Sequence, residues 1–201
     1  MLDHLERAYE ELFRWFGSDP VRETGRPAIR VVLYRREEFG RLTGLGDWAG
    51  GAFDGVVRVA VEDLGAEEER WKRVLTHELV HVFAHELGGP SVPGWLNEGL
   101  AQYLESPERS RSLRAADQRL GAVLFPLERL QGSLASWSDP EDIGRAYAQS
   151  LLLVDRIAQE YGEEALRRMV VGCADGVPPE TSFRNWASVE LAFVLELVRD
   201  R

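Results

Sequence analysis

The pentapeptide H-E-L-V-H at residues 77–81 constrains this chain more than any other part of it. It lies in the segment 67–87, where apolar residues recur at helical spacing and Gly88 provides a stop. Residues four apart lie on the same face of a helix, so both imidazoles could reach one metal ion. Glu78 lies beside them and could hold and deprotonate a water bound to that ion. The pattern therefore predicts a metal-binding helix.

A third ligand is expected further along the chain. His85 lies on the same predicted helix, about 12 Å from His77 along the axis, which is too far for one ion with ligand bonds near 2 Å. Glu98, within W-L-N-E-G-L-A at residues 95–101, offers a carboxylate on a second predicted helix after a short loop. Two imidazoles and one carboxylate leave a fourth position open, as in catalytic rather than structural zinc sites. We therefore predict one zinc ion per chain, held by His77, His81 and Glu98.

The order of the remaining elements predicts an α+β fold. Apolar, β-branched runs at residues 28–34 and 56–61 predict two strands. The stretch 18–27 is rich in turn residues, and the stretch 107–138 is irregular. We expect a single domain over residues 1–201, with a small sheet lobe and the metal helix at about 1–90 and a mainly helical lobe at about 91–201. The predicted helices span 3–16, 37–42, 67–87, 93–106, 139–161, 163–171 and 188–199, with a further piece around Phe183.

The charge and composition exclude several classes of function. A net charge of −10 argues against nucleic acid as the main partner, because phosphate binding needs a basic patch. The Arg-rich run at 109–119 is flanked by acidic residues and reads as a solvated helix face. The single cysteine, Cys173, excludes an internal disulfide. No apolar run is long enough to span a bilayer, and the first 16 residues are acidic and amphipathic. We expect a cytoplasmic protein, or a secreted one if a signal segment has been removed; the oligomeric state stays open.

These two motifs carry a resemblance to known proteins. H-E-L-V-H followed by W-L-N-E-G-L-A resembles the gluzincin superfamily of zinc metallopeptidases, and the second segment is similar to that of the alanyl aminopeptidases. The wider pattern resembles the small peptidase-MA-like domains, which share a later Y-A-x-S helix, here at residues 147–150. The resemblance covers roughly residues 29–153. It implies a thermolysin-like zincin fold with an active-site cleft between the two lobes.

The resemblance also implies roles for particular residues. Glu78 would be the general base and later the proton donor, beside the zinc ligands named above. Tyr147 would donate to the developing oxyanion, although an ordinary half-buried aromatic side chain explains it equally well. Independently of the resemblance, polar groups should orient the ligating imidazoles. Gln102, one turn past Glu98, could face the site, and Asn97 and Glu105 come after it as candidates. An ordinary polar position at the surface explains all three equally well.

A glycine-rich segment precedes the second predicted strand. In the superfamily the strand there forms the cleft rim and can bind an extended peptide, and glycines permit close backbone approach. A plain hairpin or bulge is the simpler interpretation of the same residues. The substrate-cleft candidates are Gly50, Gly51, Ala52 and Phe53.

The type of peptidase is the least constrained part of the prediction. The aminopeptidases carry a glutamate in this glycine-rich region that anchors the free amine of the substrate, and here the nearest acidic residue is Asp54. We therefore expect an endopeptidase acting on a peptide or protein rather than an aminopeptidase. Two alternatives remain open: a zinc-stabilised module that binds peptides without cutting them, and a metal-dependent hydrolase of a non-peptide bond. Glu78 disfavours the first, because a structural site needs no base.

Overall fold

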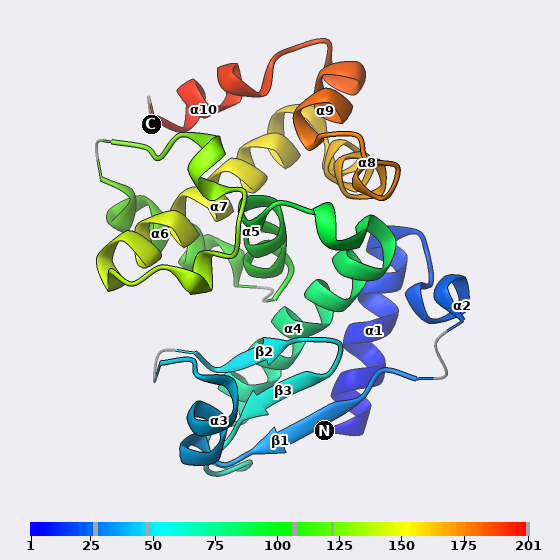
Figure 1. Ribbon diagram of the computed structural model, residues 1–201, viewed down its shortest axis with the longest axis vertical. Helices are drawn as coiled ribbons and strands as arrows, with labels where there is room; N and C mark the ends of the chain where they lie inside the picture. Colours follow the sequence, from blue (N-terminus) through cyan, green and yellow to red (C-terminus); the bar gives the residue numbers. More distant parts are fainter. Residues whose placement is uncertain (26–27, 47–48, 106–107, 122, 200–201) are drawn as a thin grey trace. The chain divides into compact units, whose positions relative to one another are not determined.

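The computed structural model describes residues 1–25, 28–46, 49–105, 108–121 and 123–199 (Figure 1). Its contacts divide the chain into two compact units: residues 1–86 with 104–106, and residues 87–103 with 107–201. The first unit contains the small sheet, and the second is helical. This arrangement confirms the predicted α+β class. That the two units form a single domain stays a prediction.

The sheet of the first unit has three strands, β1 (Val31–Tyr34), β2 (Gly51–Phe53) and β3 (Val57–Ala60). Their order is β1-β3-β2, so β3 is central and the other two are edge strands. β1 pairs with β3 in parallel, and β2 pairs with β3 antiparallel through a short hairpin. Gly55 in this hairpin has a φ of 91°, a conformation that glycine adopts without strain. The glycine-rich segment therefore forms a hairpin, which was the simpler of its two interpretations, although the bounds of β2 had not been predicted.

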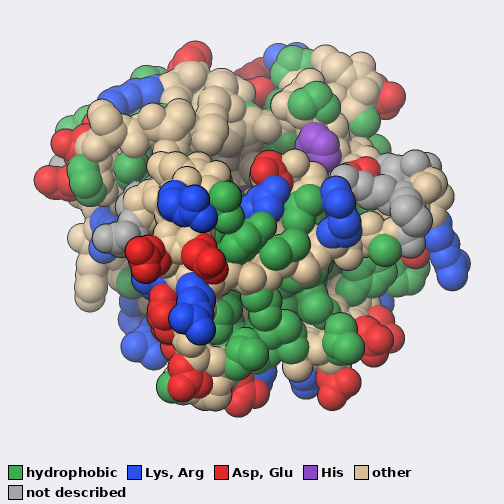
Figure 2. All heavy atoms as spheres, turned by 60° about the horizontal axis from the view of Figure 1, so that its bottom comes forward, with side chains coloured by type: hydrophobic (Ala, Val, Ile, Leu, Met, Phe, Trp, Pro, Cys, Tyr) green, Lys and Arg blue, Asp and Glu red, His purple; other side chains and the backbone are tan. Residues whose placement is uncertain are grey.

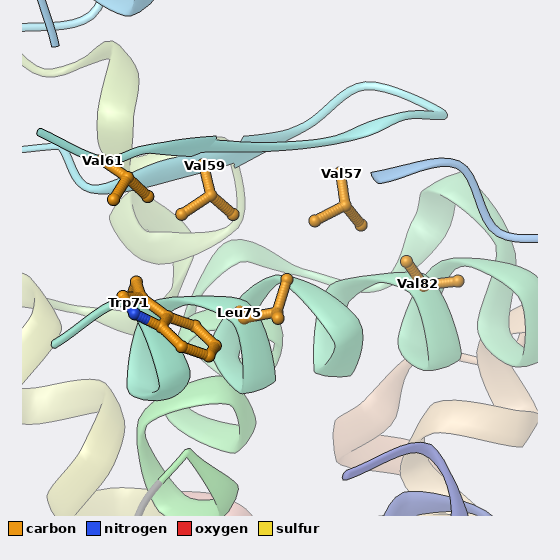
Figure 3. Packing of buried hydrophobic residues seen from close by; sticks show 6 residues of the cluster. All are labelled: Val57, Val59, Val61, Trp71, Leu75 and Val82. Atoms are coloured by element: carbon orange, nitrogen blue, oxygen red, sulfur yellow. The ribbon is translucent and has the colours of Figure 1, made fainter. Parts of the chain in front are cut away.

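The long helix α4 (Glu68–Gly88) packs against one face of this sheet. Alternate side chains of β3 and the residue after it point towards α4, because successive residues of a strand face opposite sides. Three buried side chains of α4 cover these valines, as Figure 3 shows. The cluster consists of Val57, Val59, Val61, Trp71, Leu75 and Val82.

Helix α1 (Leu2–Phe16) packs on α4 through aromatic rings. The ring of Phe83 on α4 is stacked on Phe16 and tilted against Tyr9, and the ring centroids are 5.2 Å apart in each pair. The Nε2 atom of His4 lies 3.0 Å from the carbonyl oxygen of Lys72, and burial lowers the pKa of this imidazole below its usual value. His4 is therefore a packing residue that ties α1 to α4.

Two shorter helices complete the first unit. α3 (Arg36–Thr43) covers the other face of the sheet, where Phe39 packs in a cluster with Ala49 and Ala60. α2 (Pro20–Thr24) begins after Asp19, whose carboxylate accepts from the first free N–H groups. The stretch 18–27 was predicted only as turns, so this short helix is a correction. Figure 2 shows hydrophobic side chains gathered on one face of this unit. The exposed hydrophobic residues of the unit include Leu2, Val32, Leu33, Leu42 and Leu64.

The helices of the second unit are arranged around α7, which contacts α6, α8 and α10. α7 begins after Asp139 and Pro140 as predicted, because Asp139 accepts from two N–H groups of the first turn. The stretch 107–138 was predicted to be less regular, with a solvated helix face at the Arg-rich run 109–119. That run lies on α6, in which Ala116 and Leu120 are the buried residues, and two 3-10 turns follow it. The helical elements are η1 (Gly89–Ser91), α5 (Gly94–Leu104), α6 (Arg109–Leu120), η2 (Leu127–Leu130), η3 (Leu134–Ser136), α7 (Pro140–Tyr161), α8 (Glu163–Ala174), α9 (Pro179–Ala187) and α10 (Leu191–Arg199).

The irregular segment 123–137 is bound to α7 by side chains. The buried amide of Gln149 donates to the carbonyl oxygen of Phe125 and accepts from its N–H, both at 2.8 Å. Arg129 lies over the rings of Phe125 and Trp137 and forms an ion pair of 2.9 Å with Asp142 on α7. The segment, whose regular structure is limited to the short turns η2 and η3, is thus held in a defined position by side-chain contacts. Among the described residues, no helix is both long and apolar enough to cross a membrane.

Candidate metal centre

The packing of α4 on the sheet decides where the H-E-L-V-H side chains point. At about 100° per residue, His77 and His81 lie roughly a third of a turn around the helix from the face that covers β3. Their rings are edge to face, with centroids 4.8 Å apart. Glu78 lies close to the sheet-facing side of the helix instead. The packing of α4 on the sheet therefore places the Glu78 carboxylate close to β3 and turns the two imidazoles away from the sheet.

Glu78 is buried against the edge strand β2, with 5% of its surface exposed. A Cβ atom at Gly51 would lie 2.5 Å from Glu78 Oε1 and 2.8 Å from Val74 Cγ1, closer than side chains normally approach. Only glycine leaves room for the carboxylate at this point of the strand. At the neighbouring Gly50, a Cβ would meet Val74 at 2.8 Å, but Glu78 is not among its near neighbours. Gly51 is therefore the residue of β2 that lies directly against Glu78.

His77 is held by a carboxylate of the same unit. Its Nδ1 lies 2.7 Å from Oε2 of Glu105, and only 17% and 14% of the two side chains are exposed. The other carboxylate oxygen, Oε1, lies 3.7 Å from Nε of Arg73. Because Nδ1 makes this bond, Nε2 is the nitrogen of His77 that can bind a metal ion.

In the second unit, Glu98 is positioned by close packing between α5 and α7. A Cβ atom at the next residue, Gly99, would lie 2.5 Å from the carbonyl oxygen of Ser150 and 2.6 Å from Val154 Cγ2. The amide of Gln102 donates to the carbonyl oxygens of Glu98 and, on α7, of Tyr147, at 3.1 and 3.0 Å. The glycine of W-L-N-E-G thus packs directly against the backbone of Ser150, the last residue of the Y-A-x-S motif.

The remaining sequence-predicted residues lie as follows. Tyr147 and Asn97 are half-buried on α7 and α5, and their predicted roles stay predictions. Gln102 uses its amide to join α5 to α7, which is a second explanation for its polarity. The carboxylate of Asp54 bonds Arg58 at 3.2–3.3 Å within the β2–β3 hairpin. His85 is exposed and packs edge-on against Phe53, with centroids 5.7 Å apart.

Among the described residues, His77, His81 and Glu98 form a group that could hold a metal ion, with each side chain offering one ligand atom. His81 is buried and the other two are partly buried. Two imidazole nitrogens and one carboxylate oxygen match the protein ligands of catalytic zinc sites, which keep a fourth position open. His77 bonds Glu105 through Nδ1, so Nε2 would be its ligand atom. The residues present therefore fit a zinc ion.

Glu105 was named in the sequence analysis as a candidate to orient the ligands, but its bond to His77 could not be predicted. It was no better a candidate than Asn97 or Gln102, because all three are polar residues close to Glu98 in sequence. An acidic residue at the end of α5 is only a weak indication of a role at the site. The distance from Glu105 to His77 in the structure is what identifies its partner.

A comparison with protein families agrees with these motifs. The model of one family, described as the Peptidase MA superfamily, matches residues 38–194, which include β2, β3, α4, α5 and α7. No curated protein and no solved structure shows a significant match to the chain. The family match covers most of the chain and confirms the resemblance of its two motifs to metallopeptidases. The chain belongs to the Peptidase MA superfamily.

Proposed function

We propose that this protein is a peptidase that holds one zinc ion through His77, His81 and Glu98 and uses Glu78 as its general base. The observation that carries the proposal is the placement of Glu78. It is a buried carboxylate next to a proposed ligand, and it lies against an edge strand whose glycine makes room for it. Burying a carboxylate is costly, so a site that only stabilised the fold would gain nothing from keeping it there.

The residues divide the work of peptide hydrolysis among them. A zinc ion bound by this set supplies a Lewis acid that polarises a carbonyl group and lowers the pKa of water. Glu78 accepts a proton from the attacking water and later delivers it to the leaving amine. The hydroxyl of Tyr147 donates to the carbonyl oxygen as negative charge develops there. An extended peptide pairing with the outer edge of β2 would run alongside Glu78.

We further propose that the enzyme cuts within peptides rather than removing terminal residues. Recognition of a free N-terminus needs a carboxylate beside the substrate amine. The acidic residue nearest in sequence to Gly51 is Asp54, and its carboxylate is engaged by Arg58 in the hairpin. This engagement supports cleavage of internal bonds.

The direct test is metal analysis combined with peptide-library cleavage for the wild type, Glu78→Gln and Glu69→Gln. Glu69 is the matched control, because it lies on the same helix and its side chain is 94% exposed. We expect about one zinc ion per chain in all three proteins. In Glu78→Gln, kcat should fall by about 10²- to 10⁴-fold, the usual contribution of a general base, and Glu69→Gln should match the wild type.

The result also separates the alternatives. Full activity in Glu78→Gln would refute the proposed mechanism. Peptide binding by the wild type without any cleavage would identify a binding module instead, and cleavage confined to non-peptide substrates would identify another hydrolase. Products with one residue removed from the N-terminus would overturn the proposed internal cleavage.

A further inference from the structure

We infer that Glu105 is a positioning residue for the metal centre: it fixes the tautomer and the orientation of His77, and Arg73 in turn restrains Glu105. This inference rests on the proposed zinc site, since His77 is one of its ligands. It concerns three side chains of the first unit, all of which the structure describes.

The contact between His77 and Glu105 has the features of an orienting hydrogen bond. The distance of 2.7 Å between Nδ1 and Oε2 is short, as expected for a bond to a charged acceptor. Both side chains are largely shielded from water, so solvent competes weakly for the bond. Glu105 directly follows Leu104, the last residue of α5.

The chemistry of the two groups sets the tautomer. An ionised carboxylate can only accept hydrogen bonds, so Nδ1 of His77 must carry the proton. In a neutral imidazole the other nitrogen, Nε2, then holds the lone pair that a metal ion requires. Without Glu105 the ring could exchange tautomers and rotate, and part of the population would present the wrong nitrogen. Carboxylate partners of this kind also raise the basicity of a ligating imidazole.

Arg73 adds a second, weaker restraint. It lies four residues before His77, so both side chains project from the same face of α4. Its Nε atom is 3.7 Å from Oε1, the carboxylate oxygen of Glu105 that His77 does not bond. The arginine side chain is 55% exposed, and exposed ion pairs contribute little. Its effect should therefore be clearly smaller than that of Glu105.

Zinc affinity tests the inference without depending on catalysis. The apo forms of the wild type, Glu105→Gln, Glu105→Ala, Arg73→Gln and the control Glu69→Gln would be titrated with zinc against a chromogenic chelator. We expect Glu105→Ala to bind zinc about 10- to 100-fold more weakly. Glu105→Gln keeps a neutral hydrogen-bond acceptor, so its zinc affinity should lie between those of Glu105→Ala and the wild type. Arg73→Gln should weaken binding by at most about fivefold, and Glu69→Gln should not differ from the wild type.

A spectroscopic readout distinguishes positioning from general damage. With cobalt in place of zinc, the visible absorption of Glu105→Ala should shift because His77 is held differently, while its apo form should unfold cooperatively. If Glu105→Ala does not fold, Glu105→Gln decides the question, because it keeps the size and shape of the side chain. Zinc affinities of both folded Glu105 variants within about twofold of the wild type, or an unchanged cobalt spectrum, would overturn the inference.

The same experiment separates this inference from the proposed function. A wild type that binds zinc but cleaves no peptide would contradict the peptidase, whereas the affinities would still decide the role of Glu105. A peptidase with unaltered affinity in the Glu105 variants would keep the function and remove the inference. A wild type that binds no zinc would overturn both.

Discussion

The two units position their proposed site residues by different means. In the first unit, apolar side chains pack α4 on a sheet, and a Cβ atom at Gly51 would meet the side chains of Glu78 and Val74. In the second unit, α5 meets α7 at Gly99, where the obstacle to any larger residue includes the backbone of Ser150. Side chains can rotate away from a clash, but a helix backbone cannot. A small substitution should therefore affect activity in the first unit and stability in the second.

The largest effect on stability is expected for Gly99→Ala. The added Cβ would lie 2.5 Å from the carbonyl oxygen of Ser150, so α5 and α7 must separate. We expect the free energy of unfolding to fall by about 2 kcal/mol, the typical cost of overpacking, measured by urea denaturation of the apo protein. The matched control is Gly144→Ala on α7, whose Cβ would meet only the flexible end of Arg119. Equal stabilities of the two variants would show that the α5–α7 contact can yield.

Gly51→Ala should show the opposite pattern. Its Cβ would displace the carboxylate of Glu78, and a misplacement of about 1 Å can lower a rate by roughly 100-fold. We expect kcat to fall by about 10- to 100-fold, while the free energy of unfolding changes by less than about 1 kcal/mol. Gly50→Ala is the control, because it crowds Val74 in the same way but not Glu78. Identical kinetics of the two variants would remove the special role of Gly51.

The smallest expected effect is a pH dependence that belongs to the first unit. Burial lowers the pKa of His4 below the ordinary histidine value of 6.5, so the folded state favours the neutral imidazole. The unfolded chain then takes up the proton at a higher pH. The contribution of His4 to stability is therefore complete above pH 6.5 and is lost as the pH falls through its folded pKa. In the second unit, the side chain of Gln149 ties the segment 123–137 to α7 as His4 ties α1 to α4, but its amide does not titrate.

Urea denaturation of the apo wild type and His4→Gln between pH 8 and pH 5 measures this difference. The wild type should lose stability more steeply than the variant below about pH 6.5. Parallel curves would show that His4 does not couple the packing of α1 on α4 to pH.

The predictable parts of the fold are those whose bounds are marked by residues close in sequence. The H-E-L-V-H and W-L-N-E-G-L-A motifs lie on helices as expected, because apolar spacing and a following stop define each segment. Asp139 and Pro140 start α7 at the predicted position. Asp19 and Pro20 form the same signal at the start of α2, but the five-residue helix has too few residues to show a period.

The parts that were not predicted depend on partners distant in sequence. β2 is three residues long and glycine-rich, and its strand character comes from pairing with β3. α6 has few buried residues, so the run 109–119 was read as a solvated helix face without an apolar pattern that would give the bounds of the helix. The bond from Glu105 to His77 joins residues 28 apart, and no local rule selects Glu105 over its polar neighbours.

The bond between His77 and Glu105 also bears on the order of folding. It closes a chain segment of 28 residues that contains both proposed histidine ligands and Glu98. Loop-closure entropy grows slowly with length, by about 0.6 kcal/mol per doubling, and contacts of short sequence separation form fastest. The contact of His4 with Thr76 spans 72 residues. We therefore expect the segment from His77 to Glu105 to close before α1 docks, so that the ligand-bearing part of the chain can assemble while the N-terminal helix is still free.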